Sequence, residues 1–323
     1  MRATAVIERW SIARPFTTAR GTKRTADVVV ATITDGTFEG RGECVPYPRY
    51  GDDPTHVAAY INDFRGPFER QALLDAMPAG PARNAIDCAL WDLEAKRSGK
   101  PVWHLAGVAE PTDTVTAFTV SLDHPAAMAK QADTHRRRPL LKVKLGSDDI
   151  ATDIDRLRAV RTHAPPTRLI VDANEGWTLD ALRQFIPAAV DCGVELIEQP
   201  LPASADSELE GFRPPIPLAA DESIRDGANL ATVATRYQTV NIKLDKAGGL
   251  TRALAMATEA RQLGLDIMVG CMVATSLSMA PALLLARCAR FVDLDGPELL
   301  AADRQPGLEY NAGHVSFTAG VWG

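Results

Sequence analysis

Short apolar runs alternate with longer amphipathic segments through the last two thirds of the chain. The runs are rich in β-branched residues, as in strands that are buried on both faces of a parallel sheet. Helical spacing of apolar residues separates them, for example over residues 153–163 and 253–263. Eight such runs can be counted, over residues 115–120, 140–145, 168–172, 194–198, 216–221, 239–245, 265–270 and 291–295.

Repeats of this kind predict an α/β fold with a (β/α)8 barrel of the TIM type. An open, doubly wound sheet is the alternative arrangement of the same elements. Such a sheet commonly carries a glycine-rich phosphate loop after one of its strands, and this sequence has no such loop after any predicted strand. The barrel is therefore the preferred prediction.

The first part of the chain follows another pattern. Residues 27–34 and 38–44 have the composition of two strands around a tight turn. Apolar residues at helical spacing then predict a helix over residues 82–98, which Gly99 and Pro101 end.

We therefore expect two domains. An α+β capping domain would span residues 1–110, and a barrel that carries the catalytic residues would span residues 111–299. The C-terminal segment, residues 300–323, is expected to return to the cap.

The composition is that of an ordinary globular protein, with 46% hydrophobic and 24% charged residues among 323. The formal net charge of −6 argues against nucleic acid or an anionic membrane as the main partner, because both require a basic surface. Five scattered cysteines without a Cys-x-x-Cys pair fit reduced thiols. With no segment that resembles a signal peptide or a membrane span, these features predict a cytoplasmic location.

Carboxylates stand at the C-terminal ends of three successive predicted strands, at Asp172, Glu198 and Asp221. A barrel brings such strand ends together at one mouth. Three carboxylates in one pocket require a cation, and oxygen donors without Cys or His favour Mg²⁺ over Zn²⁺. Each acid alone could instead cap the helix that follows its strand, but three in succession favour a metal site.

Lysines occupy the same layer of the predicted barrel. In Lys142-Val143-Lys144, strand alternation directs both amines to one face, toward the barrel interior. We place Lys246 at the end of the sixth predicted strand, nearly opposite the second. Two amines that face each other across a metal site suit the removal of a proton from one face of a carbon and its return to the other. Solvated surface lysines are the alternative, which the apolar residues flanking these lysines disfavour.

Five motifs in this order resemble the signature of the muconate-lactonizing subgroup of the enolase superfamily: Lys142-Val-Lys144, Asp172-Ala-Asn-Glu, Glu198-Gln-Pro, Asp221-Glu-Ser and Lys246-Ala-Gly-Gly. The resemblance covers essentially the whole chain. It implies that Asp172, Glu198 and Asp221 bind one Mg²⁺ per subunit.

The same resemblance implies roles for the lysines. Lys144 and Lys246 would be the two acid/base residues, and Lys142 would support the substrate carboxylate. Enzymes of this superfamily use a lysine or histidine base together with Mg²⁺.

The last predicted strand ends in Asp293-Leu294-Asp295, which resembles the Asp-x-Asp motif of the dipeptide epimerases. Two carboxylates on one face of a strand make an anionic pocket, which suits the free ammonium group of a dipeptide. A helix cap or a salt bridge to a barrel residue is the alternative use of this pair. The resemblance thus implies epimerisation of the glutamate α-carbon of L-Ala-D/L-Glu, a dipeptide of murein, by 1,1-proton transfer.

Further substrate contacts are expected from Thr119, from the pocket-lining pair Cys271 and Met272, and from the first cap loop, where Arg20 and Arg24 could hold the glutamate side chain. The expected partner is a small dipeptide, and a homo-oligomer is an open alternative to a monomer. Two other functions stay open. One is another enzyme of the superfamily, namely a cycloisomerase, an o-succinylbenzoate synthase or an N-acylamino acid racemase. The other is a non-catalytic dipeptide-binding relative.

Overall fold

The computed structural model describes residues 1–323. The chain begins with a three-stranded antiparallel sheet of β1 (Arg2–Thr18), β2 (Gly21–Thr34) and β3 (Glu39–Cys44), in the order β1-β2-β3. The second and third strands confirm the predicted hairpin, whereas β1 was not predicted. Because β1 is an edge strand with few buried positions, it has little of the apolar alternation that marks a strand.

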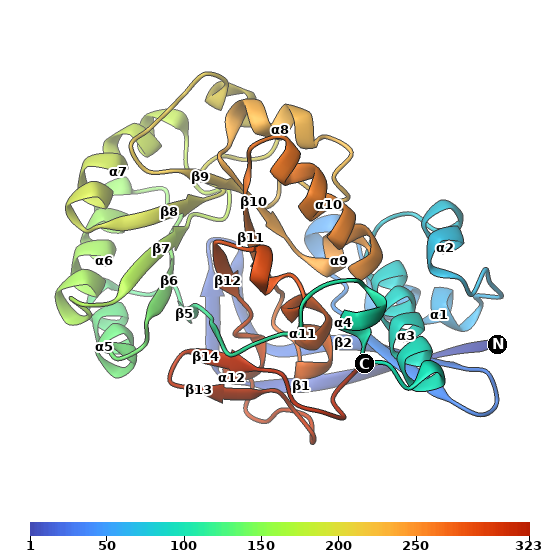
Figure 1. Cartoon of the computed structure of the whole chain (residues 1–323). Helices are drawn as coiled ribbons and strands as arrows, with labels where there is room; N and C mark the ends of the chain where they lie inside the picture. The colour runs from blue at the N-terminus through green and yellow to red at the C-terminus, as the bar shows by residue number, and fades with distance from the viewer.

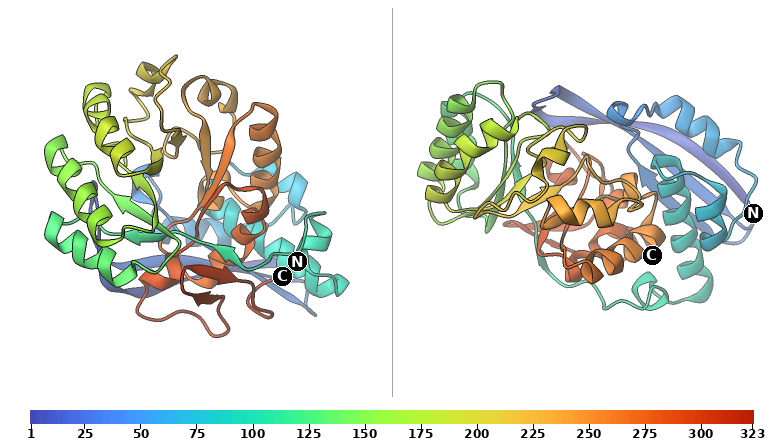
Figure 2. Two further views of the ribbon diagram at one scale, coloured as in Figure 1. Left: turned by 60° about the vertical axis from the view of Figure 1, so that its left-hand side comes forward. Right: turned by 90° about the horizontal axis from the view of Figure 1, so that it is seen from above.

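Helices cover this sheet and lie to one side of the barrel, as Figures 1 and 2 show. The helical elements of this region are η1 (Pro48–Tyr50), α1 (Pro54–Asn62), α2 (Arg70–Ala76), α3 (Pro81–Ser98) and α4 (Val102–Leu105). The predicted helix is α3, which ends at Gly99 in the left-handed conformation. Its backbone packs so closely on β3 that a Cβ at Gly42 would lie 2.2 Å from the carbonyl oxygen of Ala85.

Eight parallel strands follow one another around the barrel in sequence order, which confirms the predicted fold class. The first and last strands of the series are joined by one hydrogen bond, in which the amide of Ala117, directly before the first strand, donates to the carbonyl of Val292 in the last strand at 2.8 Å. The strands are β5 (Phe118–Val120), β6 (Leu140–Lys144), β7 (Arg168–Asp172), β8 (Val194–Glu198), β9 (Leu218–Ala220), β10 (Thr239–Ile242), β11 (Asp266–Gly270) and β12 (Phe291–Asp293).

Helices surround the strands on the outside (Figure 1). They are α5 (Pro125–His135), α6 (Ile150–His163), α7 (Leu179–Asp191), η2 (Asp206–Leu209), α8 (Leu230–Arg236), α9 (Leu244–Ala247), α10 (Leu250–Gln262), α11 (Ser276–Leu283), η3 (Ala286–Cys288) and α12 (Gly296–Leu299). None of the helices is long and apolar enough to cross a membrane.

Two predicted strands differ from the structure in an instructive way. The run 115–120 is divided, because β4 (Thr114–Val115) joins a small antiparallel sheet with β13 (Glu309–Asn311) and β14 (His314–Ser316). The run 239–245 stops at Ile242 and continues as the short helix α9. This second difference changes which lysine ends the sixth barrel strand.

The interior of the barrel has two layers, because side chains alternate along each strand. The lower layer is apolar and fully buried, and it consists of Ala117, Leu140, Ile170, Leu196, Ala219, Met268 and Phe291. Two residues further along most of these strands, the inward positions turn polar, as at Lys142, Asp172 and Glu198. The apolar layer closes the barrel from below and leaves the polar layer at its mouth.

The end of the chain contacts the first region. The indole of Trp322 donates to the carbonyl of Cys88 at 3.0 Å, and the amide of Gly323 donates to Asp92 at 2.9 Å. The division into a cap and a barrel near residue 110 stays a prediction.

Candidate active site

A cavity opens at the C-terminal ends of the barrel strands, beneath the hairpin that joins β1 and β2. Nine of the side chains predicted from the sequence line it: Arg20, Thr119, Lys142, Lys144, Asp221, Cys271, Met272, Asp293 and Asp295. Asp172 and Glu198 lie fully buried beside these residues, where their side chains contact Lys142. Arg24 and Lys246 do not line the cavity.

Lys142 is the centre of the buried charge cluster. Its Nζ lies 2.6 Å from Glu198, 2.7 Å from Asp293 and 3.2 Å from Asp172. Burial opposes the charged amine, but these carboxylates outweigh that effect and hold the pKa of Lys142 well above its usual range. The other amine of this strand, Lys144, lies 2.6 Å from Asp172. Both lysines of β6 therefore point into the barrel, as alternation predicted.

The three predicted metal ligands stand on neighbouring strand ends but are paired with lysines. In this arrangement no group of three or more His, Cys, Asp or Glu side chains converges as a metal site. The donors nevertheless fit a hard divalent cation, because the three side chains offer only carboxylate oxygens. Burial and the charge of Asp172 raise the pKa of Glu198 to about 7, and its Oε2 accepts no well-directed hydrogen bond. Such excess negative charge is what a cation would relieve.

Asp221 contacts two different lysines through its two oxygens. Lys243 Nζ lies 2.8 Å from Oδ2, and Lys246 Nζ lies 2.5 Å from Oδ1. Burial alone would raise the pKa of Asp221, but the two ammonium groups outweigh it and hold that pKa well below its usual range. The carboxylate is therefore anionic, as a metal ligand must be.

The placement of Lys246 at the end of the sixth strand was wrong. β10 ends at Ile242, so Lys243 follows it directly, whereas Lys246 lies one turn further on in α9. Lys243 lines the cavity and Lys246 is enclosed behind it. The signal for Lys243 was present in the sequence, because strand alternation from Asn241 reaches Lys243 two residues later.

Asp293 and Asp295 both line the cavity, as predicted. Asp293 Oδ2 pairs with Lys142, while its buried Oδ1 has no hydrogen-bond partner. Asp295 Oδ2 accepts a hydrogen bond of 2.7 Å from the backbone amide of Thr119. Burial and the charge of Asp293 raise the pKa of Asp295 to about 7. The pair therefore combines one salt bridge to the barrel with one carboxylate oxygen, Oδ1 of Asp293, that has no partner.

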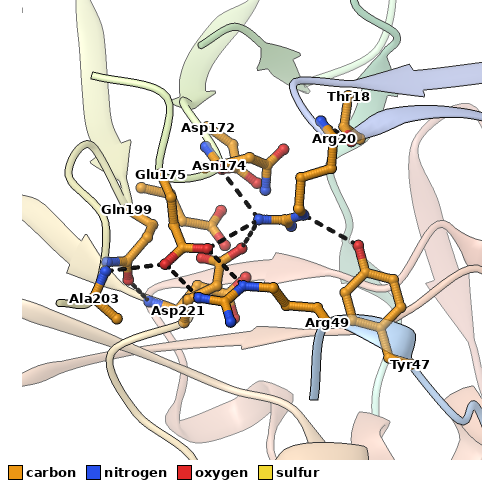
Figure 3. Close-up of polar contacts among 12 residues, drawn as sticks. Thr18, Arg20, Tyr47, Arg49, Asp172, Asn174, Glu175, Gln199, Ala203 and Asp221 are labelled. Atoms are coloured by element: carbon orange, nitrogen blue, oxygen red, sulfur yellow. Dashed lines mark hydrogen bonds and ion pairs between the residues drawn. The ribbon is translucent and has the colours of Figure 1, made fainter. Parts of the chain in front are cut away.

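The cap contributes Arg20, which reaches down from the hairpin tip (Figure 3). Its Nη1 lies 2.6 Å from Glu222 and 3.5 Å from Glu175, and its Nε donates to the hydroxyl of Tyr47 at 3.2 Å. Lys23 lies 4.3 Å from the centre of the Tyr47 ring and also lines the cavity.

Arg24 was predicted with Arg20 and is placed elsewhere. It follows Lys23 along β2, so alternation directs it to the opposite face of the strand, where it is exposed. The sequence also gave no role to Glu222, although it stands in the Asp221-Glu-Ser motif. Its buried carboxylate contacts Arg20 inside the cavity.

Two of the amines that line the cavity, those of Lys144 and Lys243, stand on opposite walls. Lys144 ends β6 and Lys243 follows β10, four strands away in a barrel of eight. Carboxylates from the intervening strands β7, β8 and β9 lie between them. A small acid held over these carboxylates would expose one face of its α-carbon to each amine.

Two family patterns match the chain. Residues 1–107 match the mandelate racemase/muconate lactonizing enzyme N-terminal domain, and residues 126–320 match the enolase C-terminal domain-like family. Together they span nearly all of the residues that build the fold and the cavity.

Curated relatives are similar over almost their full length. An L-Ala-D/L-Glu epimerase of Escherichia coli (strain K12) is 44% identical over 322 residues, which cover 98% of this chain and 99% of the relative. An N-acetyl-D-glutamate racemase of Pseudoalteromonas sp. is 44% identical over 303 residues, which cover 92% of this chain and 95% of the relative.

Solved structures give the same picture. An enolase family member of Agrobacterium tumefaciens, with homology to dipeptide epimerases and with sodium and L-Ala-L-Glu bound, has a TM-score of 0.94. It is 48% identical, and the match covers 99% of both chains. A dipeptide epimerase of Enterococcus faecalis, complexed with Mg and L-Leu-L-Tyr, has a TM-score of 0.89 at 26% identity, with 99% of this chain and 98% of that chain covered.

Proposed function

The chain belongs to the enolase superfamily, with the paired domains of its mandelate racemase/muconate lactonizing enzyme group, and we propose that it is a dipeptide epimerase. The proposed reaction is the interconversion of L-Ala-L-Glu and L-Ala-D-Glu by 1,1-proton transfer at the glutamate α-carbon. The observation that carries this proposal is the pair of amines on opposite walls, Lys144 and Lys243, with the carboxylates between them.

The lysines perform the proton transfer. One of Lys144 and Lys243 begins as a neutral amine and removes the α-proton, and the other begins as an ammonium and delivers a proton to the opposite face. The two lysines then have exchanged protonation states, so the site is set for the reverse reaction. This assignment replaces Lys246 with Lys243, because only Lys243 lines the cavity.

The carboxylates Asp172, Glu198 and Asp221 would hold one Mg²⁺ per subunit. When bound, the ion supplies electrostatic stabilisation to the negative charge that develops on the substrate carboxylate as the α-proton leaves. Lys142 stands among the same groups and adds a second positive charge there.

The ends of the dipeptide have complementary partners. Asp293 and Asp295 would accept the free ammonium group, and Thr119 would hold Asp295 in place through its amide. Arg20, with Lys23 beside it, would bind the glutamate side-chain carboxylate at the cap end of the cavity. Cys271 and Met272 would line the wall between these ends. Murein-derived dipeptides as the physiological substrates and a cytoplasmic location belong to the proposal as predictions from the sequence.

A racemase of N-acylated glutamate is the second candidate, since one relative with 44% identity carries that activity in its name. Such a substrate shares the α-carbon, the carboxylates and the proton transfer, but it has no ammonium group. The buried pair Asp293 and Asp295 favours the dipeptide, because an acyl group gives these carboxylates no charge to bind.

The test is to incubate the protein with Mg²⁺ in D₂O and to follow the glutamate α-proton by NMR. L-Ala-L-Glu and N-acetyl-L-glutamate are supplied in separate tubes. We expect deuterium at the α-carbon and formation of the L,D isomer in the first tube, at a rate at least tenfold above that in the second. A faster reaction in the second tube would establish the N-acyl racemase instead. Exchange in neither tube would contradict both functions.

A further inference from the structure

Lys246 has no hydrogen available for a substrate. Its buried Nζ donates to Asp221 Oδ1 at 2.5 Å, to the backbone carbonyl of Asp221 at 2.5 Å and to the carbonyl of Asn241 at 3.2 Å. A lysine ammonium has three donors, and these three acceptors use all of them. We infer that Lys246 is a positioning residue, which fixes the Asp221 carboxylate and takes no part in proton transfer.

The two carboxylate oxygens of Asp221 have different partners. Oδ1 is held from behind by Lys246, which is 1% exposed, and Oδ2 faces the cavity beside Lys243. Lys246 also donates a hydrogen bond to the backbone carbonyl of Asp221, so it holds both the backbone and the side chain of this residue. Oδ2 is thereby kept on the cavity side, where it can bind a cation or accept a hydrogen bond from the Lys243 amine.

The cap helix holds the short helix that carries Lys246. Arg83 of α3 donates to the carbonyls of Ala247 and Gly248, at 2.7 and 3.0 Å. These contacts lie at the C-terminal end of α9, where the helix carbonyls have no partners within the helix. α9 is therefore fixed against the cap at the turn directly after Lys246.

The two glycines after Lys246 make this contact possible. Both have positive φ, and a Cβ at Gly248 would lie 2.5 Å from Arg83 Nε. A Cβ at Gly249 would lie 2.5 Å from the side chain of Asp87. The sequence Lys246-Ala-Gly-Gly thus combines a lysine that reaches into the barrel with a backbone that admits the cap helix. The cap then acts on the chemistry through α9, Lys246 and Asp221, although it is remote from the proton transfer.

The first test uses the metal-free protein and needs no substrate. Lys246→Met, Asp221→Asn and the double variant are unfolded with urea and compared with the wild type in a double-mutant cycle. We expect Lys246→Met to raise the unfolding constant about 100-fold, because it leaves the Asp221 carboxylate without its fixed partner. In the Asp221→Asn background the same change should raise it less than about tenfold. Lys243→Met is the comparison variant. Its amine pairs with the other oxygen of Asp221, so it should also couple to Asp221→Asn, but it leaves the contact of Lys246 with the backbone carbonyl of Asp221 in place.

The second test separates positioning from acid/base chemistry, and this arm rests on the proposed function. In Lys246→Met at saturating Mg²⁺, exchange of the α-proton with D₂O should fall at least about tenfold, and by the same factor for both isomers of the dipeptide. KM should change less than about threefold, because Lys246 does not touch substrate. Lys243→Met, in contrast, should retain exchange for one isomer only.

Several outcomes would overturn the inference. Additive effects of Lys246→Met and Asp221→Asn on unfolding would show that the lysine does not act on this carboxylate. Loss of exchange for one isomer alone would restore Lys246 as an acid/base residue. Unchanged kcat in the folded variant would leave it a purely structural role. If Lys246→Met does not fold, Lys246→Gln, which keeps a donor without the charge, enters the same cycle with the same criteria. Exchange absent from the wild type would contradict the proposed function and leave the unfolding cycle to decide this inference.

Discussion

The same strands build two interior layers of opposite character. The lower layer consists of apolar side chains such as Leu140, Ile170 and Leu196, which are at most 2% exposed. Two residues later along β6, β7 and β8 stand Lys142, Asp172 and Glu198. These charged side chains are as fully buried as the apolar ones. The lower layer gains free energy by burial, whereas the upper layer must balance desolvated charges against one another. Burial therefore stabilises the fold in the lower layer, whereas in the upper layer it shifts the pKa values of the charged groups.

The largest expected effect is on the upper layer. Lys243→Ala should lower epimerisation of both isomers about 10³-fold, because it removes one of the two groups that exchange the proton. NMR in D₂O should still detect exchange of the α-proton of one isomer through Lys144. Unfolding measured on the same preparation should show that the variant is folded at the assay temperature, although Asp221 loses one of its two buried lysine partners. Exchange of both isomers at wild-type rates would contradict the two-face assignment.

In the lower layer, the loss should be in stability and not in rate. Leu196→Ala should lower the free energy of unfolding by about 3 kcal/mol, because it leaves a cavity in a close-packed layer. Its kcat, measured well below the unfolding temperature, should stay within about twofold of the wild type, since the layer makes no contact with substrate. Urea unfolding and initial rates on one preparation check both statements. A large loss of kcat in the fully folded variant would mean that the layers are not independent.

In the metal-free protein, the upper layer should also lower the free energy of unfolding in a pH-dependent way. The pKa of Asp295 is raised to about 7 by burial and by Asp293, whereas an unfolded aspartate titrates near about 3.9. Between these values the folded state binds more protons, so this group makes stability fall as pH rises from about 4 to about 7. Asp295→Asn removes this effect. It should stabilise the protein by on the order of 2 kcal/mol at pH 8 and by little at pH 4.

Thermal unfolding at both pH values, with and without the substitution, checks this sign. The same variant should turn over dipeptides more slowly while it still binds Mg²⁺. Equal effects of Asp295→Asn at both pH values would show that the carboxyl is not protonated in the folded protein.

The smallest effect concerns the cap loop. Arg20→Ala should raise KM for L-Ala-L-Glu about tenfold, because it removes a charged partner of the side-chain carboxylate. KM for L-Ala-L-Ala should change little. Arg24→Ala is the matched control and should leave both values within about twofold, since Arg24 is exposed on the opposite face of β2. Equal effects of the two substitutions would remove Arg20 from the substrate site.

The barrel was predictable because the sequence pattern of each strand is local, within about five or six neighbouring residues. Most of the strands are short, largely buried apolar runs, and several end in a polar residue at the mouth, so strand ends such as Asp172 and Glu198 are found by counting alone. The metal-ligand and acid/base roles themselves stay predictions. The edge strand β1 escaped notice because solvent covers much of it and no period of two emerges.

The errors in the site also have physical reasons. Lys243 and Lys246 are both flanked by apolar residues, and only the end of β10 at Ile242 decides which of them faces the cavity. The helix α9 that follows is held at its C-terminal end by Arg83, far away in the sequence, and local spacing does not reveal this contact. Arg24 was misplaced because the sequence does not show where the hairpin turns, and one residue of register reverses the face.

The cavity draws its walls from separate parts of the chain, and this has a consequence for redesign. In the proposed function, the hairpin tip with Arg20 and Lys23 would meet only the far end of a substrate, whereas the amines and acids around the α-carbon would come from the barrel. A library confined to the hairpin would vary which side chains are accepted and leave the reactive atoms in place. Substitutions in the hairpin could therefore change which substrates are accepted, while the barrel residues around the α-carbon stay the same. Both protein engineering and natural selection can exploit this separation.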